Sequence, residues 1–235
     1  MLKQRLNEDG KIEVGLDEAG RGSFLGPLVA GAVVWPEESK WTEEHLKIAP
    51  HIRDSKKIAP KKRVKLAEDI KRLATSWAAG FVSATEIDEY GVTWGNQEAF
   101  RRALGDITCP YDNVVLDGTM SVPGLLNQRS IIDGDALYLH VAAASIIAKT
   151  EHDKWIEQFC QENPQCSEKY DLLNNKGYGT AKHILGLRTY GYTIHHRCTF
   201  IHNHVNTGFI RLPHPVKDQP QTEVCLIRLT LAKAI

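Results

Sequence analysis

Residues 11–35 of the chain, KIEVGLDEAGRGSFLGPLVAGAVVW, carry the strongest secondary-structure pattern in the sequence. Residues 11–17 have the pattern of a β-strand, and residues 28–35 are apolar nearly throughout, which is typical of a second strand. The glycines and the proline of residues 19–27 predict a turn between the two strands. The first strand ends in a carboxylate, Asp17, directly before this turn.

The rest of the chain shows strand and helix patterns without an internal repeat, a low-complexity tract or a Gly/Ser linker. Further strands are predicted over residues 77–83 and 113–117. Helices are predicted from Pro60, with Val64, Leu66, Ile70 and Leu73 on the apolar face; over residues 85–104, with interruptions at Gly91 and Gly95; from an N-cap at Asp135; and over residues 180–190. Because strands lead and helices accumulate later, we expect an α/β or α+β domain with a mixed β-sheet.

The composition limits the class of protein. The chain has 235 residues, of which 42% are hydrophobic, so it has enough apolar side chains to bury a core. No apolar run reaches the roughly 18 residues that span a bilayer, and the first residues form no apolar secretory segment. We therefore expect a cytoplasmic protein that does not enter a membrane.

Charge and cysteine content exclude further classes. The chain has 29 Lys and Arg against 29 Asp and Glu, a net charge of zero that argues against indiscriminate coating of nucleic acid. Five cysteines without a C-x-x-C pair predict reduced thiols rather than a disulfide framework or a zinc ribbon. Residues 206–235 hold three prolines before an apolar end, so we expect a domain over residues 1–205 followed by a C-terminal tail.

Four acidic residues stand at ends of predicted elements. Asp17 and Glu18 end the first strand, Asp117 ends the strand over residues 113–117, and Asp135 precedes a long helix. Each alone is a common turn or cap residue, but the ends of strands in an α/β sheet form ligand crevices, where these carboxylates would converge. Like charges at short distance need a neutralising cation, and hard oxygen ligands favour Mg²⁺ or Mn²⁺ over Zn²⁺.

The glycines at 20, 22 and 26 do not match a nucleotide-binding loop. Their spacing misses the dinucleotide pattern G-x-G-x-x-G by one residue, and the chain has no G-x-x-x-x-G-K-[ST] sequence. The loop is either a tight turn between strands or a place where exposed backbone groups and Arg21 receive a phosphate beside the carboxylates.

The sequence of this region resembles the opening signature of the type 2 ribonucleases H, and most closely that of the ribonuclease HII branch. The matching residues are Val14-Gly15-Leu16-Asp17-Glu18-Ala19-Gly20-Arg21-Gly22 and Gly26-Pro27-Leu28-Val29-Ala30. Further stretches match the family in the same order: Asp54-Ser55-Lys56-Lys57, Leu116-Asp117-Gly118, Gly134-Asp135, residues 143–149, and Lys176-Gly177-Tyr178-Gly179-Thr180 with His183. The resemblance covers about residues 11–205.

This resemblance implies a ribonuclease H-like fold, a mixed sheet flanked by helices, and a two-metal mechanism with Mg²⁺ or Mn²⁺. The implied metal ligands and catalytic residues are Asp17, Glu18, Asp117 and Asp135. The family cleaves the RNA strand of RNA–DNA hybrids. The HII branch also cuts 5′ of a single ribonucleotide embedded in duplex DNA, which leaves a 3′-hydroxyl and a 5′-phosphate. We expect a monomer with these nucleic acids as partners.

The resemblance also assigns residues to the substrate. In the family, the glycine–arginine–glycine loop contacts the ribose 2′-hydroxyl and the tyrosine of the Lys-Gly-Tyr motif stacks on the neighbouring deoxyribose. These roles fall on Gly20, Arg21, Gly22 and Tyr178. The physics agrees, because the 2′-hydroxyl is the group that distinguishes RNA from DNA at one nucleotide and glycines allow the backbone to approach it.

Residues 51–72 form a basic stretch with nine Lys and Arg against three acids. Alone it would be a solvated helix face, but beside a nuclease signature it favours contact with a duplex backbone. Lys56 and Lys149 are the candidates for phosphate contacts. Lys149 has the alternative of an i,i+4 ion pair with Asp153.

Two other patterns suggest ligands or partners only weakly. His196, Cys198, His202 and His204 share parity, so an extended segment would place them on one face as in a zinc site, but no paired-cysteine spacing accompanies them. Gln221-x-x-Val224 is similar to a sliding-clamp motif but lacks its aromatic pair, so clamp binding is an alternative that we do not expect.

The chain departs from the family in places. The family has an asparagine near the start of the helix where this chain has Gly91, and Ser23-Phe24 replaces small-plus-proline residues after the glycine loop. Two other functions stay open: a metal-dependent DNA nuclease or resolvase that needs no ribose, and a hybrid-binding module without catalysis. The four carboxylates argue against the binding module, because clustered negative charges would repel a nucleic acid and serve no purpose in a protein that only binds it.

Overall fold

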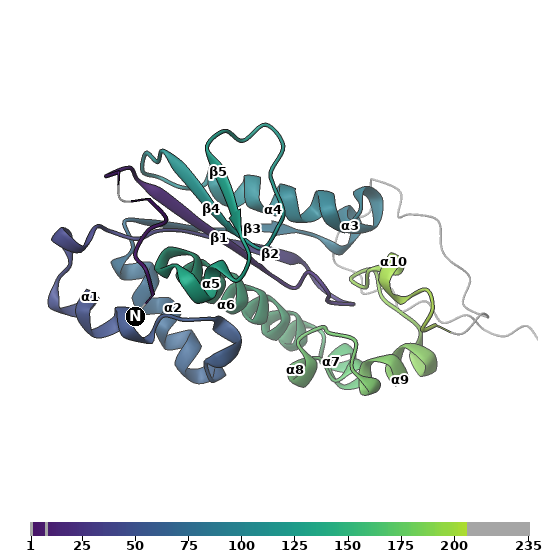
Figure 1. Cartoon of the computed structure of the whole chain (residues 1–235). Helices are drawn as coiled ribbons and strands as arrows, with labels where there is room; N and C mark the ends of the chain where they lie inside the picture. The colour runs from purple at the N-terminus through teal and green to yellow at the C-terminus, as the bar shows by residue number, and fades with distance from the viewer. Residues whose placement is uncertain (1, 8, 206–235) are drawn as a thin grey trace, which may run out of the picture.

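The computed structural model describes residues 2–7 and 9–205, in which a five-stranded sheet carries helices on both faces (Figure 1). The strands are β1 (Glu13–Ala19), β2 (Leu28–Val34), β3 (Ser76–Val82), β4 (Asn113–Asp117) and β5 (Gln128–Ile131), in the spatial order β3-β2-β1-β4-β5. The β1–β2 and β2–β3 pairs are antiparallel, whereas β1–β4 and β4–β5 are parallel. The mixed sheet of the expected ribonuclease H-like class is therefore confirmed.

The helices lie between and after the strands. They are α1 (Glu43–Ile48), α2 (Pro60–Leu73), α3 (Ala84–Tyr90), α4 (Val92–Gly105), α5 (Gly134–Leu137), α6 (Leu139–Glu162), α7 (Pro164–Tyr170), α8 (Leu172–Asn175), α9 (Ala181–Tyr190) and α10 (Cys198–Ile201), with short 3-10 turns η1 (Glu38–Lys40), η2 (Ala49–His51) and η3 (Ser55–Lys57). The structure places α4 and α6 on opposite faces of the sheet (Figure 1). In the described part of the chain, no helix combines the length and the apolar character needed to cross a bilayer.

The parallel pairing of β1 with β4 decides where the acidic residues meet. In its register Leu16 lies opposite Leu116, so the next residues along the two strands, Asp17 and Asp117, emerge side by side at the same edge. Adjacent parallel strands end at the same edge of a sheet, which is where ligands bind in α/β folds.

Three glycines allow the long helices to approach the sheet closely. A Cβ at Gly15 or Gly31 would lie 2.4 Å or 2.3 Å from the backbone of α6, and a Cβ at Gly80 would lie 2.1 Å from the backbone of α4. Because no side chain separates strand and helix at these points, the backbone of α6 packs directly against β1 and β2, and the backbone of α4 packs directly against β3.

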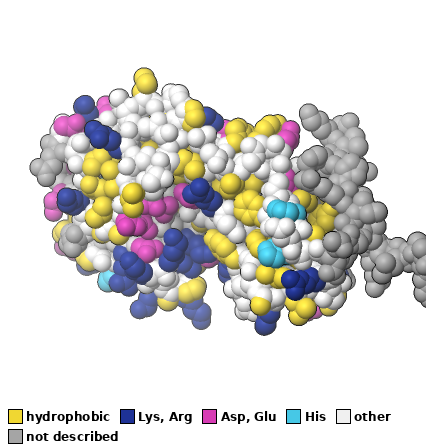
Figure 2. All heavy atoms as spheres, turned by 45° about the vertical axis from the view of Figure 1, so that its right-hand side comes forward, with side chains coloured by type: hydrophobic (Ala, Val, Ile, Leu, Met, Phe, Trp, Pro, Cys, Tyr) yellow, Lys and Arg dark blue, Asp and Glu magenta, His cyan; other side chains and the backbone are white. Residues whose placement is uncertain are grey.

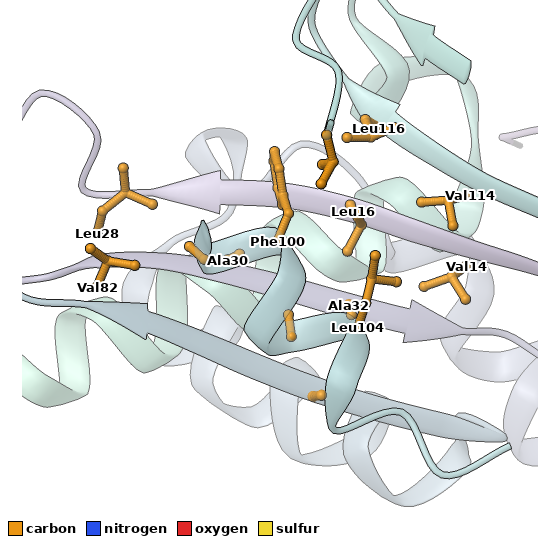
Figure 3. Close-up of a cluster of buried hydrophobic side chains, with 14 of the residues drawn as sticks. Val14, Leu16, Leu28, Ala30, Ala32, Val82, Phe100, Leu104, Val114 and Leu116 are labelled. Carbon is orange, nitrogen blue, oxygen red and sulfur yellow. The ribbon is translucent and has the colours of Figure 1, made fainter. Parts of the chain in front are cut away.

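The apolar core divides between the two faces. On the α4 face, Phe100 and Leu104 pack against side chains of β1, β2 and β4 such as Leu16 and Leu116 (Figure 3). On the other face, Leu139, Ile146 and other residues of α6 pack against β2 and α2. The far half of α6 extends to a third cluster around Tyr170, which joins α7, α9 and the loop after Gly22.

Most predicted elements are confirmed, and the differences have local causes. Gly95 does not interrupt a helix but lies inside α4, buried against Ile87 and Val82. Asp135 is not the N-cap of the long helix; it lies in the first turn of α5, and α6 begins only after Tyr138.

Two further details differ from the expectations. Val64 is 49% exposed, because Arg63 takes the buried position on α2 beside Leu66 and Ile70. The edge strand β5 lacks a clear apolar alternation and has no predicted counterpart.

The close approach of α6 to β2 gives a test of the packing. Gly31→Ala would place a methyl group against the carbonyl of Ala144, so we expect it to lower the free energy of unfolding by about 1–3 kcal/mol, as overpacked cores do. Gly105→Ala is the control, since a Cβ there meets nothing within 4 Å and the change favours the helix. Denaturant unfolding of both variants would measure this, and equal effects would contradict the packing argument.

Candidate active site

Four carboxylates come together at the edge of the sheet where β1 and β4 end. Asp17 and Glu18 belong to the end of β1, Asp117 is the last residue of β4, and Asp135 lies in the first turn of α5. The backbone N–H of Asp135 donates to Oδ1 of Asp117 at 3.4 Å, which ties α5 to the end of β4. The structure thus brings together all four acidic residues named from the sequence.

Burial and mutual repulsion disfavour ionisation of this cluster. Burial, followed by the charges of Glu18 and Asp117, raises the pKa of Asp17 well above its ordinary value. Burial and then Asp117 raise the pKa of Asp135 to about 6. Burial also raises the pKa of Glu18, although Arg21 opposes the rise. These carboxylates are therefore stabilised in their ionised form by any cation that enters between them.

Two basic side chains border the cluster. Nη1 of Arg21 lies 3.7 Å from Oε1 of Glu18. Burial lowers the pKa of Lys56, but the charges of Asp17 and neighbouring carboxylates outweigh it, so the pKa of Lys56 is raised. On the surface, Figure 2 shows acidic side chains gathered into a patch with Lys and Arg side chains directly beside it.

An asparagine completes the cluster from the α4 side. Asn96 is 1% exposed and lies near enough to Glu18 to favour its ionised form. In the described residues, however, neither its Oδ1 nor its Nδ2 forms a hydrogen bond of regular geometry. A buried amide oxygen without a regular partner beside four carboxylates fits a hard divalent cation or the water that such a cation carries.

The donor chemistry therefore fits Mg²⁺ or Mn²⁺, with Asp17, Glu18, Asp117 and Asp135 as the residues that would hold the ions. Among residues 2–7 and 9–205, no three His, Cys, Asp or Glu side chains are already arranged as a closed metal-binding set. Chelation would therefore require the carboxylates to move inward, against the repulsion that raises their pKa values.

The glycine loop lies directly after the carboxylates and is held by buried groups. Gly20 has a φ of +77°, and a Cβ there would lie 2.4 Å from the ring of His152. Its N–H donates to the hydroxyl of Tyr178 at 3.1 Å, while Arg21 and Gly22 are exposed. Tyr178 therefore contacts the buried start of the loop, next to the exposed Arg21 and Gly22.

A buried arginine donates hydrogen bonds to both ends of this loop. Arg197 is fully buried and donates from Nη1 to the carbonyl of Arg21 at 2.9 Å and from Nη2 to that of Gly26 at 3.0 Å. Burial lowers its pKa to about 10, so it is a cation at neutral pH. The charge of Arg197 is thus satisfied by backbone carbonyls, which shape the loop.

Asp153 on α6 joins further elements to the loop. It accepts from Nζ of Lys149 at 2.6 Å and lies 3.4 Å from Nη2 of Arg63 on α2. Nδ1 of His152 lies 3.2 Å from Oδ1 of Asp153, and its Nε2 lies 3.3 Å from Oγ of Ser23. The Lys149–Asp153 ion pair offered as an alternative is therefore present.

Lys149 is also placed beside the candidate substrate residues. Its Nζ lies 5.4 Å from the ring centroid of Tyr178. The basic stretch is divided: Arg63 is buried, and Lys71 and Arg72 form ion pairs with Glu151 and Glu44. Within the described residues, the side chains of this stretch without an ion pair are Arg53, Lys56, Lys61, Lys62 and Lys65.

The His/Cys pattern does not form one face. His196 is buried against His183, Cys198 begins α10, and His204 stacks on Phe24. His202 is exposed and contacts the carbonyl of Thr199. The clamp-like motif and the rest of the expected tail, residues 206–235, lie outside the described residues.

Several residues of the site were not identified from the sequence. For Asn96 the resemblance offered a signal, an asparagine near the start of this helix, but Asn96 lies five residues after Gly91, the position compared with it. His152, Asp153 and Arg197 reach the loop from α6 and from the end of the domain. A motif search alone finds no reason to pair them with residues 20–26.

The raised pKa of Asp135 predicts a pH-dependent stability. The pKa of an Asp in an unfolded chain is about 3.9, whereas that of Asp135 in the folded chain is about 6, so folding disfavours the ionised carboxylate. The free energy of unfolding is therefore highest, as far as Asp135 is concerned, below pH ~4, and it falls as the pH rises through about 6. We expect Asp135→Asn to remove that loss, which makes the metal-free variant more stable than wild type by about 1–3 kcal/mol above pH 6. Denaturant unfolding in EDTA across pH 4–8 measures the difference.

Asp106→Asn, at an exposed aspartate outside the cluster, is the matched control, and its free energy of unfolding should not rise above that of wild type at high pH. We define the gap as the difference in the free energy of unfolding between a variant and wild type. Mg²⁺ or Mn²⁺ should narrow the gap between wild type and Asp135→Asn, because ions stabilise the state that binds them. A gap that is equal at pH 4 and pH 8 would contradict the repulsion argument.

Comparisons with known proteins identify the family of this chain. The family model for Ribonuclease HII matches residues 14–204. The ribonuclease HII of Ehrlichia canis (strain Jake) is 39% identical over 200 residues, which cover 85% of this chain and 90% of the relative. The crystal structure of ribonuclease H2 from Pyrococcus horikoshii OT3 superposes with a TM-score of 0.65 at 25% identity, covering 80% of this chain and 93% of that one.

A more distant structure, Bst-RNase HIII in complex with Mn²⁺, shares the fold with a TM-score of 0.57 at 19% identity, covering 77% of this chain and 63% of that chain. The family match spans the acidic cluster, the glycine loop and Tyr178 together. The chain therefore belongs to the ribonuclease HII family and is an endoribonuclease.

Proposed function

We propose that this protein is a divalent-metal-dependent nuclease that hydrolyses the RNA strand of RNA–DNA hybrids and nicks duplex DNA 5′ of an embedded ribonucleotide. The observation that carries the proposal is the position of the loop Gly20–Arg21–Gly22 and Tyr178 directly beside the four carboxylates. A group that recognises a ribose and a group that cuts a phosphodiester thus act on adjacent parts of one substrate.

The metal chemistry rests on the carboxylates. Mg²⁺ or Mn²⁺ held by Asp17, Glu18, Asp117 and Asp135 would supply an activated water and stabilise the leaving oxygen, which yields 3′-hydroxyl and 5′-phosphate ends. Asn96 would orient Glu18 or a water from the α4 side.

The glycine loop supplies ribose recognition. The 2′-hydroxyl both donates and accepts, and the exposed residues Arg21 and Gly22 carry backbone groups of both kinds, of which the carbonyl of Arg21 already accepts from Arg197. The ring of Tyr178, held against Gly20, would pack on the neighbouring deoxyribose. Arg21, already beside Glu18, would contact the phosphate between the two sugars.

Basic residues extend the contact to the duplex. Lys56 lies at the cluster and Lys149 at Tyr178, whereas Lys61, Lys62 and Lys65 lie exposed on α2. These cations would hold phosphates on both sides of the scissile bond. The family match over residues 14–204 supports the proposal that residues 1–205 form the catalytic domain. We further propose that the protein is cytoplasmic and acts as a monomer.

The first test removes a central carboxylate. Asp17→Asn should lower the cleavage rate of a labelled duplex with one ribonucleotide by about 10³-fold or more, because it removes a charged oxygen from the proposed metal ligands. The fold should persist, since the change removes a repelled charge. Rates are measured with Mg²⁺, with Mn²⁺ and with EDTA, beside Asp106→Asn as control.

The same assay separates the alternative functions. Equal cleavage of an all-DNA duplex would favour a nuclease that needs no ribose. Hybrid binding that EDTA does not alter, without cleavage under either metal, would favour a binding module. Cleavage by Asp17→Asn at the wild-type rate with a native unfolding profile would overturn the assignment.

A second test addresses ribose recognition. Tyr178→Ala removes the ring that packs beside the loop, so we expect kcat/KM on the single-ribonucleotide duplex to fall about tenfold or more. Tyr178→Phe retains the ring but removes the hydroxyl acceptor for Gly20, and it should lose less. Unchanged kcat/KM in Tyr178→Ala would exclude this contact.

A further inference from the structure

Two buried histidines contact each other behind Tyr178, and the proposed chemistry does not use them. His183 on α9 and His196 are 0% and 1% exposed, and their Nε2 atoms lie 3.1 Å apart. The ring of Tyr170 packs on both, with centroid distances of 5.7 Å and 4.7 Å. A close contact between two ring nitrogens is favourable only if one donates and the other accepts.

The outer contacts of the pair decide where the protons are. The N–H of Thr193 donates to Nδ1 of His196 at 2.9 Å, so this nitrogen carries a lone pair and the proton of the neutral ring is on Nε2. At the other end, Nδ1 of His183 lies 3.0 Å from the carbonyl oxygen of Tyr178, which can only accept. His183 therefore donates from Nδ1 and accepts at Nε2 from His196.

This is the one pair of neutral tautomers that satisfies all three contacts. Burial lowers the pKa of His183 to about 4 and that of His196 well below its ordinary value, which agrees with two neutral rings. A second proton on either ring would set two N–H donors against each other or against the N–H of Thr193.

The chain of hydrogen bonds ends at the residue that contacts the glycine loop. The carbonyl of Tyr178 accepts from His183, while the hydroxyl of Tyr178 accepts from the N–H of Gly20 at 3.1 Å. The backbone of the same segment is joined to the loop, since Phe24 donates to the carbonyl of Gly177 at 2.8 Å. Displacement of the Tyr178 backbone would therefore move its ring relative to the loop.

We propose that His183 and His196 are positioning residues: as a neutral pair with fixed tautomers, they hold the main chain at Tyr178 so that its ring faces the substrate beside the glycine loop. The proposal rests on the proposed function for the role of Tyr178. It adds a specificity-determining support that acts through another residue and has no contact of its own with substrate.

The first experiment reads the tautomers in the full chain without metal or substrate. In ¹⁵N-histidine NMR spectra, assigned with His183→Asn and His196→Gln, His196 should carry its proton on Nε2 and His183 on Nδ1. Both rings should stay neutral from pH 6 to pH 8. The opposite tautomer at either ring, or averaging between the two forms, would overturn the proposal whether or not the protein is active.

The second experiment is a double-mutant cycle on the single-ribonucleotide duplex. His183→Leu should lower kcat/KM by about as much as Tyr178→Ala and no more, about tenfold, because it misplaces the ring that Tyr178→Ala removes. In the background of Tyr178→Ala the same change should have little further effect, since His183 acts through Tyr178. Effects that multiply would show a merely structural role and overturn the proposal.

Conservative and matched variants complete the design. His183→Asn keeps an N–H near the position of Nδ1, so it should recover most of the activity that His183→Leu loses. Leu187→Ala, in the same buried cluster, controls for lost packing and should multiply with Tyr178→Ala. An inactive wild type with the expected tautomers would refute the proposed function and with it the role of Tyr178, whereas an active wild type with multiplicative effects would refute the positioning role alone.

Discussion

The parallel pairing of β1 with β4 is the constraint on which the rest of the site depends. It sets Asp17 beside Asp117 at one edge of the sheet, and α5 brings Asp135 to the same place. The resulting repulsion is costly: burial and neighbouring charges raise the pKa values of Asp17 and Asp135. A fold that retains such a cluster gives up stability, which the proposed binding of cations would explain, and such a compromise is common at functional sites.

The pairing is supported by close contact between sheet and helices. The glycines of β1 and β2 let the backbone of α6 lie against the strands, so the same helix that packs under the carboxylates continues to the glycine loop. There it presents His152 and Asp153 to the loop. From the other side Arg197 holds the loop carbonyls. The carboxylate-bearing strand β1 and the glycine loop thus both contact α6, which favours a fixed distance between the proposed metal site and the proposed ribose contact.

Much of this arrangement could be predicted from sequence. The strands around the glycine loop, the carboxylates at the strand ends and Tyr178 have local patterns or family motifs, and the structure places them together. The predictions failed where packing overrides local pattern. Gly95 lies within a helix because it packs against Ile87. Arg63 is buried because its guanidinium forms an ion pair with Asp153 and donates a hydrogen bond to the carbonyl of Ser55.

The order of residues along the chain indicates the chemistry that this protein can carry out: carboxylates at strand ends, a glycine loop, a basic stretch and the motifs of a nuclease family. The folded chain sets which of these side chains pair with one another. It assigned Lys149 to Asp153 and His196 to His183, and it brought Asn96 to Glu18. The physical reason is that charge pairing and burial depend on groups that are distant in the chain. Strand ends and glycine turns, in contrast, depend on the identity of neighbouring residues.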